Sequence, residues 1–187
     1  MNSMSKRYYD PCKKHENCEC EHKHCEHDHC EKECKNEKHC PTIIKCGSPS
    51  STTIPVATVV GTTFIVSSLT LDNSCLCNPI TKLEFASNLI TPVAFTGSID
   101  FQVFKLCKCQ LTPVPVGPAW TFNLVALLES KTFSFFVCDC DSCFNECCTY
   151  TVVATVTSPV TVGTLSINNA TLGAISTCST CGRNNCC

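Results

Sequence analysis

Apolar and polar side chains alternate with a period of two residues through long stretches of the chain between residues 98 and 157. Ile99, Phe101 and Val103 alternate with more polar neighbours, and the same pattern returns at residues 122–128 and 150–156. A period of two places successive side chains on opposite faces of a β-strand, and no window of helical length shows the helical period. The pattern therefore predicts an all-β domain with essentially no helix.

Pro and Gly residues separate the β-type stretches from one another. The expected strands lie at residues 53–60, 62–72, 81–90, 98–108, 119–129, 132–138, 148–157 and 160–171. Eight short strands with alternating faces bury their apolar sides when two sheets pack against each other. We therefore predict an eight-stranded β-sandwich with a jelly-roll-like topology, an immunoglobulin-like topology being the other natural closure.

Composition changes abruptly near Cys40. Residues 1–45 carry 18 charged side chains and all six histidines, whereas residues 46–187 carry only 12 charged side chains. The first segment has almost no large apolar residue, so it cannot bury enough surface to offset its chain entropy. We predict three parts: a flexible, extended Cys/His-rich N-terminal connector arm at 1–45, a β-sandwich domain at 46–177 and a Cys-rich C-terminal tail at 178–187.

The chain contains 21 cysteines, an odd number, so at least one thiol per chain must stay free, bind a metal or pair with another molecule. In the domain many of them form close doublets at the ends of expected strands, where side chains two apart share a face. Such a doublet rarely bonds to itself, because the small ring strains the disulfide geometry. The candidate disulfide cysteines of the domain and tail are Cys46, Cys75, Cys77, Cys107, Cys109, Cys138, Cys140, Cys143, Cys147, Cys148, Cys178, Cys181, Cys186 and Cys187.

These cysteines allow three interpretations. Disulfides within the sandwich and between subunits are favoured by the doublets. Zinc binding is the second, because the Cys140/Cys143 and Cys178/Cys181 pairs have the ligand spacing of a zinc ribbon, although with a long intervening segment. Buried reduced thiols are the third, and they fit single cysteines in strands better than doublets beside polar residues.

The arm repeats the tetrapeptide His-x-His-Cys at a five-residue step. Imidazole and thiolate groups this dense would capture zinc, nickel or copper if offered, which makes His22, His24, Cys25, His27, His29 and Cys30 candidate metal ligands. The alternative is a solvated tail whose thiols become cross-links between subunits. The candidates for these intersubunit disulfides are Cys12, Cys18, Cys20, Cys25, Cys30, Cys34 and Cys40. No cofactor is required by either interpretation, and zinc or another transition metal at the arm is an option.

Several classes of function are disfavoured by composition. The domain has no histidine, no paired carboxylate motif and no glycine-rich phosphate loop, so we expect no enzymatic activity. Only Arg7 and Arg183 supply guanidinium groups, which argues against a nucleic acid partner. No apolar run approaches the roughly 20 residues that span a bilayer. Residues 1–10 lack the apolar core of a secretory signal, so we expect synthesis in a cytoplasm without a signal peptide.

Several short motifs of this chain point to a known family. They are Cys46-Gly47-Ser48-Pro49, Thr62-Thr63-Phe64, Leu71-Asp72-Asn73-Ser74-Cys75-Leu76-Cys77-Asn78-Pro79, Lys82-Leu83-Glu84-Phe85, Cys147-Cys148-Thr149-Tyr150-Thr151 and Asn169-Ala170-Thr171-Leu172-Gly173-Ala174-Ile175. On these motifs, residues 42 to 178 resemble a cysteine-rich family of unknown function from spore-forming clostridia. In design the chain is also similar to the subunits of bacterial endospore appendages.

The resemblance to endospore appendages carries structural implications. It implies a leaderless jelly roll that stacks into a helical fibre by β-sheet augmentation, with connector cysteines bonded to strand cysteines of preceding subunits. The connector thiols would then come from Cys12 to Cys40. The acceptors would come from Cys46, Cys75, Cys77, Cys107, Cys109, Cys138 and Cys140. This chain departs from the appendage pattern in its longer, His-rich connector and its four C-terminal cysteines.

The leading hypothesis is therefore a self-assembling structural subunit of a disulfide-cross-linked fibre or layer on the spore surface, whose main partner is itself. Synthesis in the reducing cytoplasm of the mother cell would precede oxidation, which would follow when that cell lyses. One alternative is a metal-binding module that uses the arm. Another is an adhesin-like domain that binds a ligand through the Pro-rich Thr112–Trp120 loop with Trp120 as a stacking residue, although a lone Trp more often lies in the core.

Overall fold

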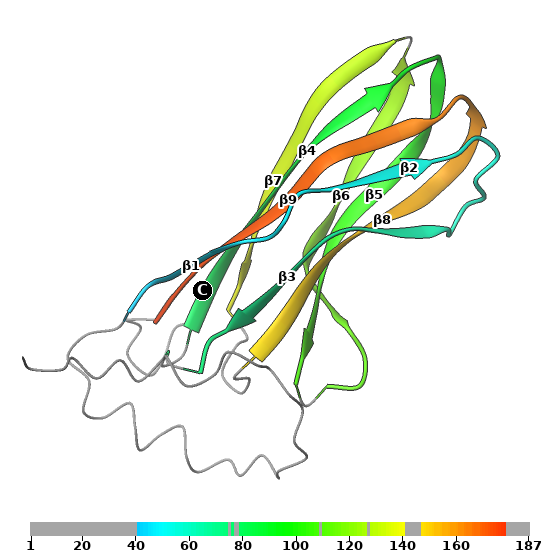
Figure 1. Ribbon diagram of the computed structural model, residues 1–187. Coiled ribbons are helices and arrows are strands. Elements are labelled where there is room, and N and C mark those ends of the chain that lie inside the picture. The colour runs from blue at the N-terminus through cyan, green and yellow to red at the C-terminus, as the bar shows by residue number, and fades with distance from the viewer. Residues whose placement is uncertain are drawn as a thin grey trace, which may run out of the picture.

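The computed structural model describes residues 41–74, 76, 79–108, 110–126, 128–140 and 147–178 of the chain. These residues form an all-β sandwich of two antiparallel sheets and contain no helix, which confirms the predicted fold class (Figure 1). None of them forms a helix long and apolar enough to cross a membrane. The strands are β1 (Ile43–Cys46), β2 (Ser50–Ile54), β3 (Thr63–Asp72), β4 (Pro79–Thr91), β5 (Phe95–Cys107), β6 (Val114–Ala126), β7 (Glu129–Asp139), β8 (Cys147–Val162) and β9 (Leu165–Cys178).

One sheet, called sheet A here, has the order β1-β9-β4-β7, and β2 also pairs with β9. The other, sheet B, has the order β3-β8-β5-β6. Strands β1 and β2 pair with successive parts of β9, at residues 173–176 and 165–170, so together they fill a single strand position at the edge of sheet A. The sandwich therefore has eight strand positions, as predicted, although nine strands are present among the described residues.

The strand pairs are nested like the two arms of a folded ribbon. Strand β5 pairs with β6, β4 with β7, β3 with β8 and β2 with β9, each in the antiparallel sense. Two further antiparallel pairings, β4 with β9 and β5 with β8, join the folded ribbon into its two sheets. This wrapping of one long two-stranded ribbon is the topology of a jelly roll.

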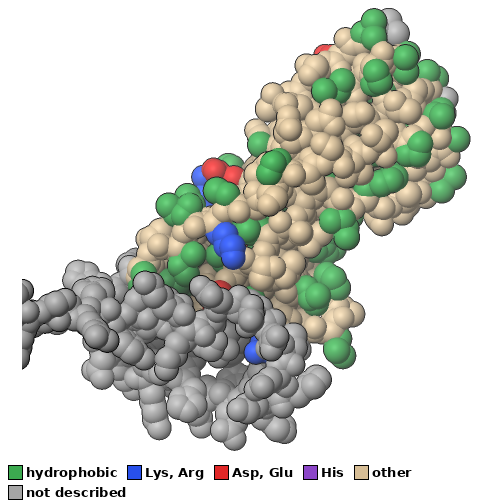
Figure 2. Space-filling model, in the orientation of Figure 1, with side chains coloured by type: hydrophobic (Ala, Val, Ile, Leu, Met, Phe, Trp, Pro, Cys, Tyr) green, Lys and Arg blue, Asp and Glu red, His purple; other side chains and the backbone are tan. Residues whose placement is uncertain are grey.

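The core lies between the sheets and follows from the period of two. In β4 and β5 buried and partly exposed residues alternate without interruption along almost the whole strand. The centre is aromatic: Phe85 of sheet A lies 6.0 Å, centroid to centroid, from Phe101 of sheet B, and 5.2 Å from Phe135. Aromatic rings at such separations stabilise the fold by more than the burial of their apolar area alone. The outer surface shows few charged side chains among scattered hydrophobic ones on the face seen in Figure 2.

Three details differ from the expected strand limits. The strand expected at 53–60 ends at Ile54, and a separate β1 precedes it. The break expected at Pro159 is absent, because β8 continues to Val162 and the chain turns at Gly163. Pro159 fits there because the β5–β8 register shifts between the Ser98–Ser158 and Thr96–Val162 pairs, so the missing N–H of the proline falls at an irregularity of the ladder.

The Pro-rich segment expected as a loop, Thr112–Trp120, is another difference. It is largely part of β6, which lies at the edge of sheet B where proline is tolerated. The register against β5 shifts between Phe101 and Val103, and Gly117 has a φ of 69°. The shift absorbs the irregular backbone, so the strand continues past Pro118.

Candidate functional site

Most of the described cysteines lie at one end of the sandwich. Strands β5 and β9 end at Cys107 and Cys178, β8 begins at Cys147, and Cys138 is next to the last residue of β7. Pairing brings these strand termini together, since Cys107 lies opposite Cys148 and Pro79 lies opposite Cys178. We call this the cysteine end. Because antiparallel strands alternate in direction, cysteine doublets that are distant in sequence come together at the same end of the two sheets.

Cys107 and Cys148 form a disulfide between neighbouring strands of sheet B, with their Cα atoms 4.0 Å apart. The next residue pair in the ladder is hydrogen-bonded, because Lys108 N–H donates to the carbonyl oxygen of Cys147 at 3.1 Å. The two cysteines therefore occupy a non-hydrogen-bonded pair, the position in which opposite residues approach most closely. Both are buried, so this bond belongs to the core.

The other described cysteines differ in bonding and in exposure. Cys147 and Cys178 are also disulfide-bonded, and Cys140 is half-buried. Cys46 and Cys138 are free thiols and both are exposed. The cysteine end thus holds oxidised pairs as well as accessible thiols.

The remaining predicted site residues lie outside the described residues. They are the arm cysteines Cys12, Cys18, Cys20, Cys25, Cys30, Cys34 and Cys40, the candidate metal ligands His22, His24, His27 and His29, and Cys75, Cys77, Cys109, Cys143, Cys181, Cys186 and Cys187. Within the part of the chain that the structure describes, no three His, Cys, Asp or Glu side chains form a group that could hold a metal.

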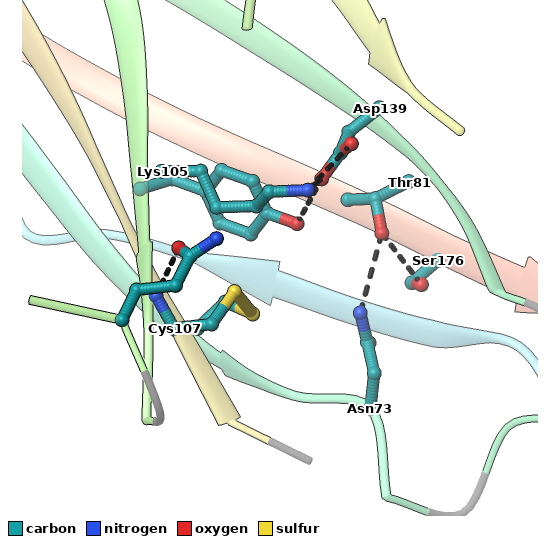
Figure 3. A network of polar contacts seen from close by, with 9 residues as sticks. Asn73, Thr81, Lys105, Cys107, Asp139 and Ser176 are labelled. Carbon is teal, nitrogen blue, oxygen red and sulfur yellow. Dashed lines mark hydrogen bonds and ion pairs between the residues drawn. A yellow bond between two sulfur atoms is a disulfide. The ribbon is translucent and has the colours of Figure 1, made fainter. Parts of the chain in front are cut away.

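A buried ion pair bridges the two sheets just inside the cysteine end (Figure 3). The ammonium of Lys105 in β5 donates to the carboxylate oxygens of Asp139 in β7 at 2.9 and 2.8 Å. The hydroxyl of Tyr150 in β8 donates to the Oδ2 atom of Asp139 at 2.7 Å. The side chains of Lys105 and Asp139 are only 5% and 3% exposed. Burial of this kind is tolerated when every charge is paired and hydrogen-bonded, as it is here.

A row of buried hydroxyls continues the polar layer across sheet A. The pairing register places Ser176, Thr81 and Asp139 side by side on the inner face. The hydroxyl oxygens of Thr81 and Ser176 are 2.9 Å apart, and the side-chain amide of Asn73 donates to Thr81 at 3.4 Å. The core is therefore layered, with a polar layer at the cysteine end and an aromatic layer at its centre.

The protonation of Tyr150 follows from this environment. Burial raises the pKa of Tyr150 far above its usual range, and the negative charge of Asp139 and the hydrogen bond to it raise the pKa further, while Thr81 opposes the shift. The phenol stays protonated and acts as a hydrogen-bond donor. The arrangement joins β5, β7 and β8, which come from both sheets, by charge and hydrogen bonds.

Trp120, the candidate stacking residue, is 39% exposed, so it does not lie in the core. Its indole stacks on Phe135 with ring centroids 5.7 Å apart and an angle of 20° between the planes. A hollow of about 380 Å³ lies elsewhere, at the end opposite the cysteines, lined by residues 56–60 with Pro159 and Val160. Its lining is mostly apolar, with the hydroxyl of Thr58 as its polar side-chain group, and includes no ionisable side chain.

Residues 40–177 match a protein family described as a domain of unknown function, DUF4489. The match covers most of the chain and the whole of the sandwich from β1 to all but the last residue of β9. The chain belongs to the DUF4489 family. Comparison with curated proteins finds no match to this DUF4489 chain.

Among solved structures, the DUF4489 domain is similar to a chain in the structure of infectious bursal disease virus, Gx strain. The TM-score is 0.46 and the identity 7%, over 74% of this chain and 32% of that one. It is similar to the VP2 subviral particle of the same virus with a TM-score of 0.43 and 10% identity, over 75% of this chain and 33% of that one. For tailspike protein 4 of bacteriophage CBA120 the TM-score is 0.34 and the identity 12%, over 70% of this chain and 19% of that one. The chain spans about a third of the length of the two bursal disease virus chains. These similarities add nothing to the fold derived above and give no function.

Proposed function

We propose that this DUF4489 protein is a structural subunit that assembles with copies of itself into a disulfide-cross-linked fibre or layer on the spore surface. The observation that carries the proposal is the cysteine end, where disulfides and two exposed free thiols, Cys46 and Cys138, lie on one β-sandwich. A folded β-domain with accessible thiols is suited to covalent joining of subunits. No catalytic step is assigned to it.

The location on a spore rests on the resemblance of residues 42–178 to a clostridial spore family. That resemblance also explains how a protein made in a reducing cytoplasm acquires disulfides, because lysis of the mother cell exposes it to oxidant. The seven arm cysteines supply further thiols for bonds between subunits. Many such bonds in parallel would make dissociation a chemical event that requires a reductant.

The test is the apparent mass of oxidised full-length protein on a denaturing gel, boiled with and without reductant. The proposal expects high-mass material that collapses to the 20.4 kDa monomer only with reductant. A variant with all seven arm cysteines changed to serine should give shorter polymers, and electron microscopy of the wild type should show fibres or sheets. A clean monomer under both conditions would exclude covalent self-assembly.

The spore assignment needs a separate test. An antibody against the sandwich should label the surface of intact spores of a host that encodes the protein, and spores that lack the gene should show no label. Label confined to the cytoplasm of vegetative cells would contradict the proposed location without affecting the result of the gel.

A further inference from the structure

Strands β1 and β7 are the two outermost strands of sheet A. All neighbours in this sheet are antiparallel, so β1 and β4 run in one direction while β9 and β7 run in the other. A second copy that placed its β1 beside β7 would therefore continue the antiparallel sheet without any change in strand direction. The sheet has complementary edges at its two sides.

Each of these edges carries one exposed free thiol, Cys46 on β1 and Cys138 on β7. The register joins Cys46 to Phe136 through Gly173 and Glu84, which puts Cys46 two residues from the level of Cys138. Residues opposite each other in an antiparallel sheet share a face. Both thiols therefore project from the outer face of sheet A near the cysteine end.

Within one copy the two thiols are too far apart to bond to each other. Three strand spacings separate β1 from β7, which amounts to about 14 Å across the sheet. A disulfide requires Cα atoms within about 7 Å. Any bond between Cys46 and Cys138 must then join different copies.

Near Cys138 the β7 edge lacks the usual protection against strand addition, although Glu129 and Lys131 lie at the other end of the strand. Natural edge strands are blocked by charged residues, proline or bulges. Residues 133–138 of β7 contain no charge and no proline, and the β4–β7 register is regular from Thr81 to Thr91. Large apolar side chains are exposed on the same face near both edges: Ile44 is 71% exposed, Phe136 57% and Ile175 43%. A second copy added at this edge would cover part of this apolar surface.

We propose that β7 of one copy adds to β1 of the next and that Cys138 forms a disulfide with Cys46 across the new strand pair. The proposal deepens the proposed function and rests on it, because it names the thiols and strands that join two subunits directly. The sandwich already contains a bond of this type, between opposite residues Cys107 and Cys148 on neighbouring antiparallel strands. The contact is head-to-tail, so each copy keeps one edge for a further neighbour and the assembly grows into a ring or a fibre.

The bond requires an oxidant, for which a small-molecule disulfide suffices. One thiolate attacks the disulfide and releases one small thiol, and the second protein thiolate then displaces the other small thiol from the mixed disulfide. Two protein thiols and one small disulfide become one protein disulfide and two small thiols. The protons of the protein thiols end on the two released thiols.

The experiment uses an equal mixture of full-length protein of natural isotopic composition and full-length protein labelled with nitrogen-15. The mixture is oxidised with oxidised glutathione, remaining thiols are alkylated, and the unreduced digest is analysed by mass spectrometry. The proposal expects a linked peptide pair that contains Cys46 and Cys138, with half of the pairs combining one light and one heavy peptide. Cys46→Ser should abolish this pair and leave Cys138 as a free thiol or as its mixed disulfide with glutathione.

A matched pair of variants tests the strand contact itself. Phe136→Lys and Thr132→Lys both add a lysine to an exposed position on the outer face of β7, but only residue 136 is next to Cys138 along that face. Phe136→Lys should reduce the yield of the linked pair at least severalfold, and Thr132→Lys, which is farther from Cys138 and would face β2 of the next copy, should reduce it much less. Equal effects of the two variants would overturn the strand pairing.

The remaining outcomes separate this inference from the proposed function. A reducible polymer in which Cys46 and Cys138 are alkylated, capped by glutathione or bonded to other cysteines would overturn the inference and leave covalent self-assembly intact. Linked pairs made only of two light or two heavy peptides would place the bond within one copy and overturn it as well. The absence of any reducible polymer would overturn both.

Discussion

Lys105 and Asp139 pair across the interior of the sandwich, joining β5 of one sheet to β7 of the other through two charged hydrogen bonds. Tyr150 supplies a third donor to the same carboxylate. Removing one member of such a group leaves the others buried without a partner, which costs far more than the group as a whole contributes. Any packing of the two sheets that separates these groups would therefore be strongly destabilised.

Lys105→Met is expected to lower the free energy of unfolding by about 3–5 kcal/mol, because it leaves the charge of Asp139 buried without its cation. The triple variant Lys105→Met, Asp139→Leu, Tyr150→Phe should recover most of that loss, since no polar group stays unpaired. Urea unfolding of the full-length chain with its free thiols alkylated measures both. A triple variant as unstable as the single one would show that the polar group is itself stabilising.

Stability at alkaline pH should depend on Tyr150. Its pKa is raised in the folded state, so above about pH 10 the unfolded chain loses the phenol proton first and stability falls by up to about 1.4 kcal/mol per pH unit. Tyr150→Phe removes this contribution. The difference in unfolding free energy between wild type and Tyr150→Phe should be constant below about pH 9 and shrink above about pH 10. A constant difference throughout would mean that the phenol titrates normally in the fold.

The Cys107–Cys148 disulfide closes a loop with a sequence separation of 41. Replacing both cysteines by alanine should lower the free energy of unfolding by about 4 kcal/mol, the loop entropy expected for that length. The matched control is Cys46→Ala with Cys138→Ala, which removes two exposed thiols and should change stability by less than about 0.5 kcal/mol. Comparable losses in the two double variants would mean that the disulfide does not constrain the unfolded chain as proposed.

Gly163 forms the tight turn between β8 and β9 with a φ of 71°, and a Cβ there would overlap the carbonyl oxygen of Ala94. Gly61 has a similar φ of 86°, but a Cβ at that position would meet no atom within 4 Å. Gly61→Ala should cost about 1–2 kcal/mol for the left-handed backbone alone. Gly163→Ala should cost clearly more, because it adds a collision with backbone. Thermal unfolding of the two variants side by side gives the comparison, and equal shifts in Tm would show that the turn can relax.

Much of the fold could be predicted because period-two alternation reports directly on burial. The series Ile99, Phe101 and Val103 is fully buried, as its spacing predicts. The limits of the strands are harder to predict, because proline and glycine often end a strand but do not always do so. Pro159 and Pro118 lie within strands because each falls at a register shift against β5, and such a shift is not visible in the residues themselves.

The buried ion pair was missed although a signal for it exists. Lys105 continues the buried series of β5 in steps of two, and Asp139 continues the buried series Phe135 and Val137 of β7. A charged residue at an inward position requires a partner of opposite charge. The pairing itself depends on which strands face each other, and local sequence does not contain that information. The same applies to Cys46 and Cys138, which share a face only because β9 and β4 lie between them.

The nested ribbon has a consequence for the order in which the domain folds. β5 and β6 are adjacent along the chain, whereas the β2–β9 contact between Ser50 and Ala170 spans a sequence separation of 120. Closing a longer loop costs more entropy, and contacts of large separation slow folding. We expect the ribbon to zip outward from β5–β6, so that β1, which bears Cys46, is secured last. Pulse-labelled hydrogen exchange would show protection of the β5–β6 pair before that of β1 and β9, and simultaneous protection would contradict it. A Cys46 edge that exists only on a finished domain would keep half-folded chains out of the growing assembly.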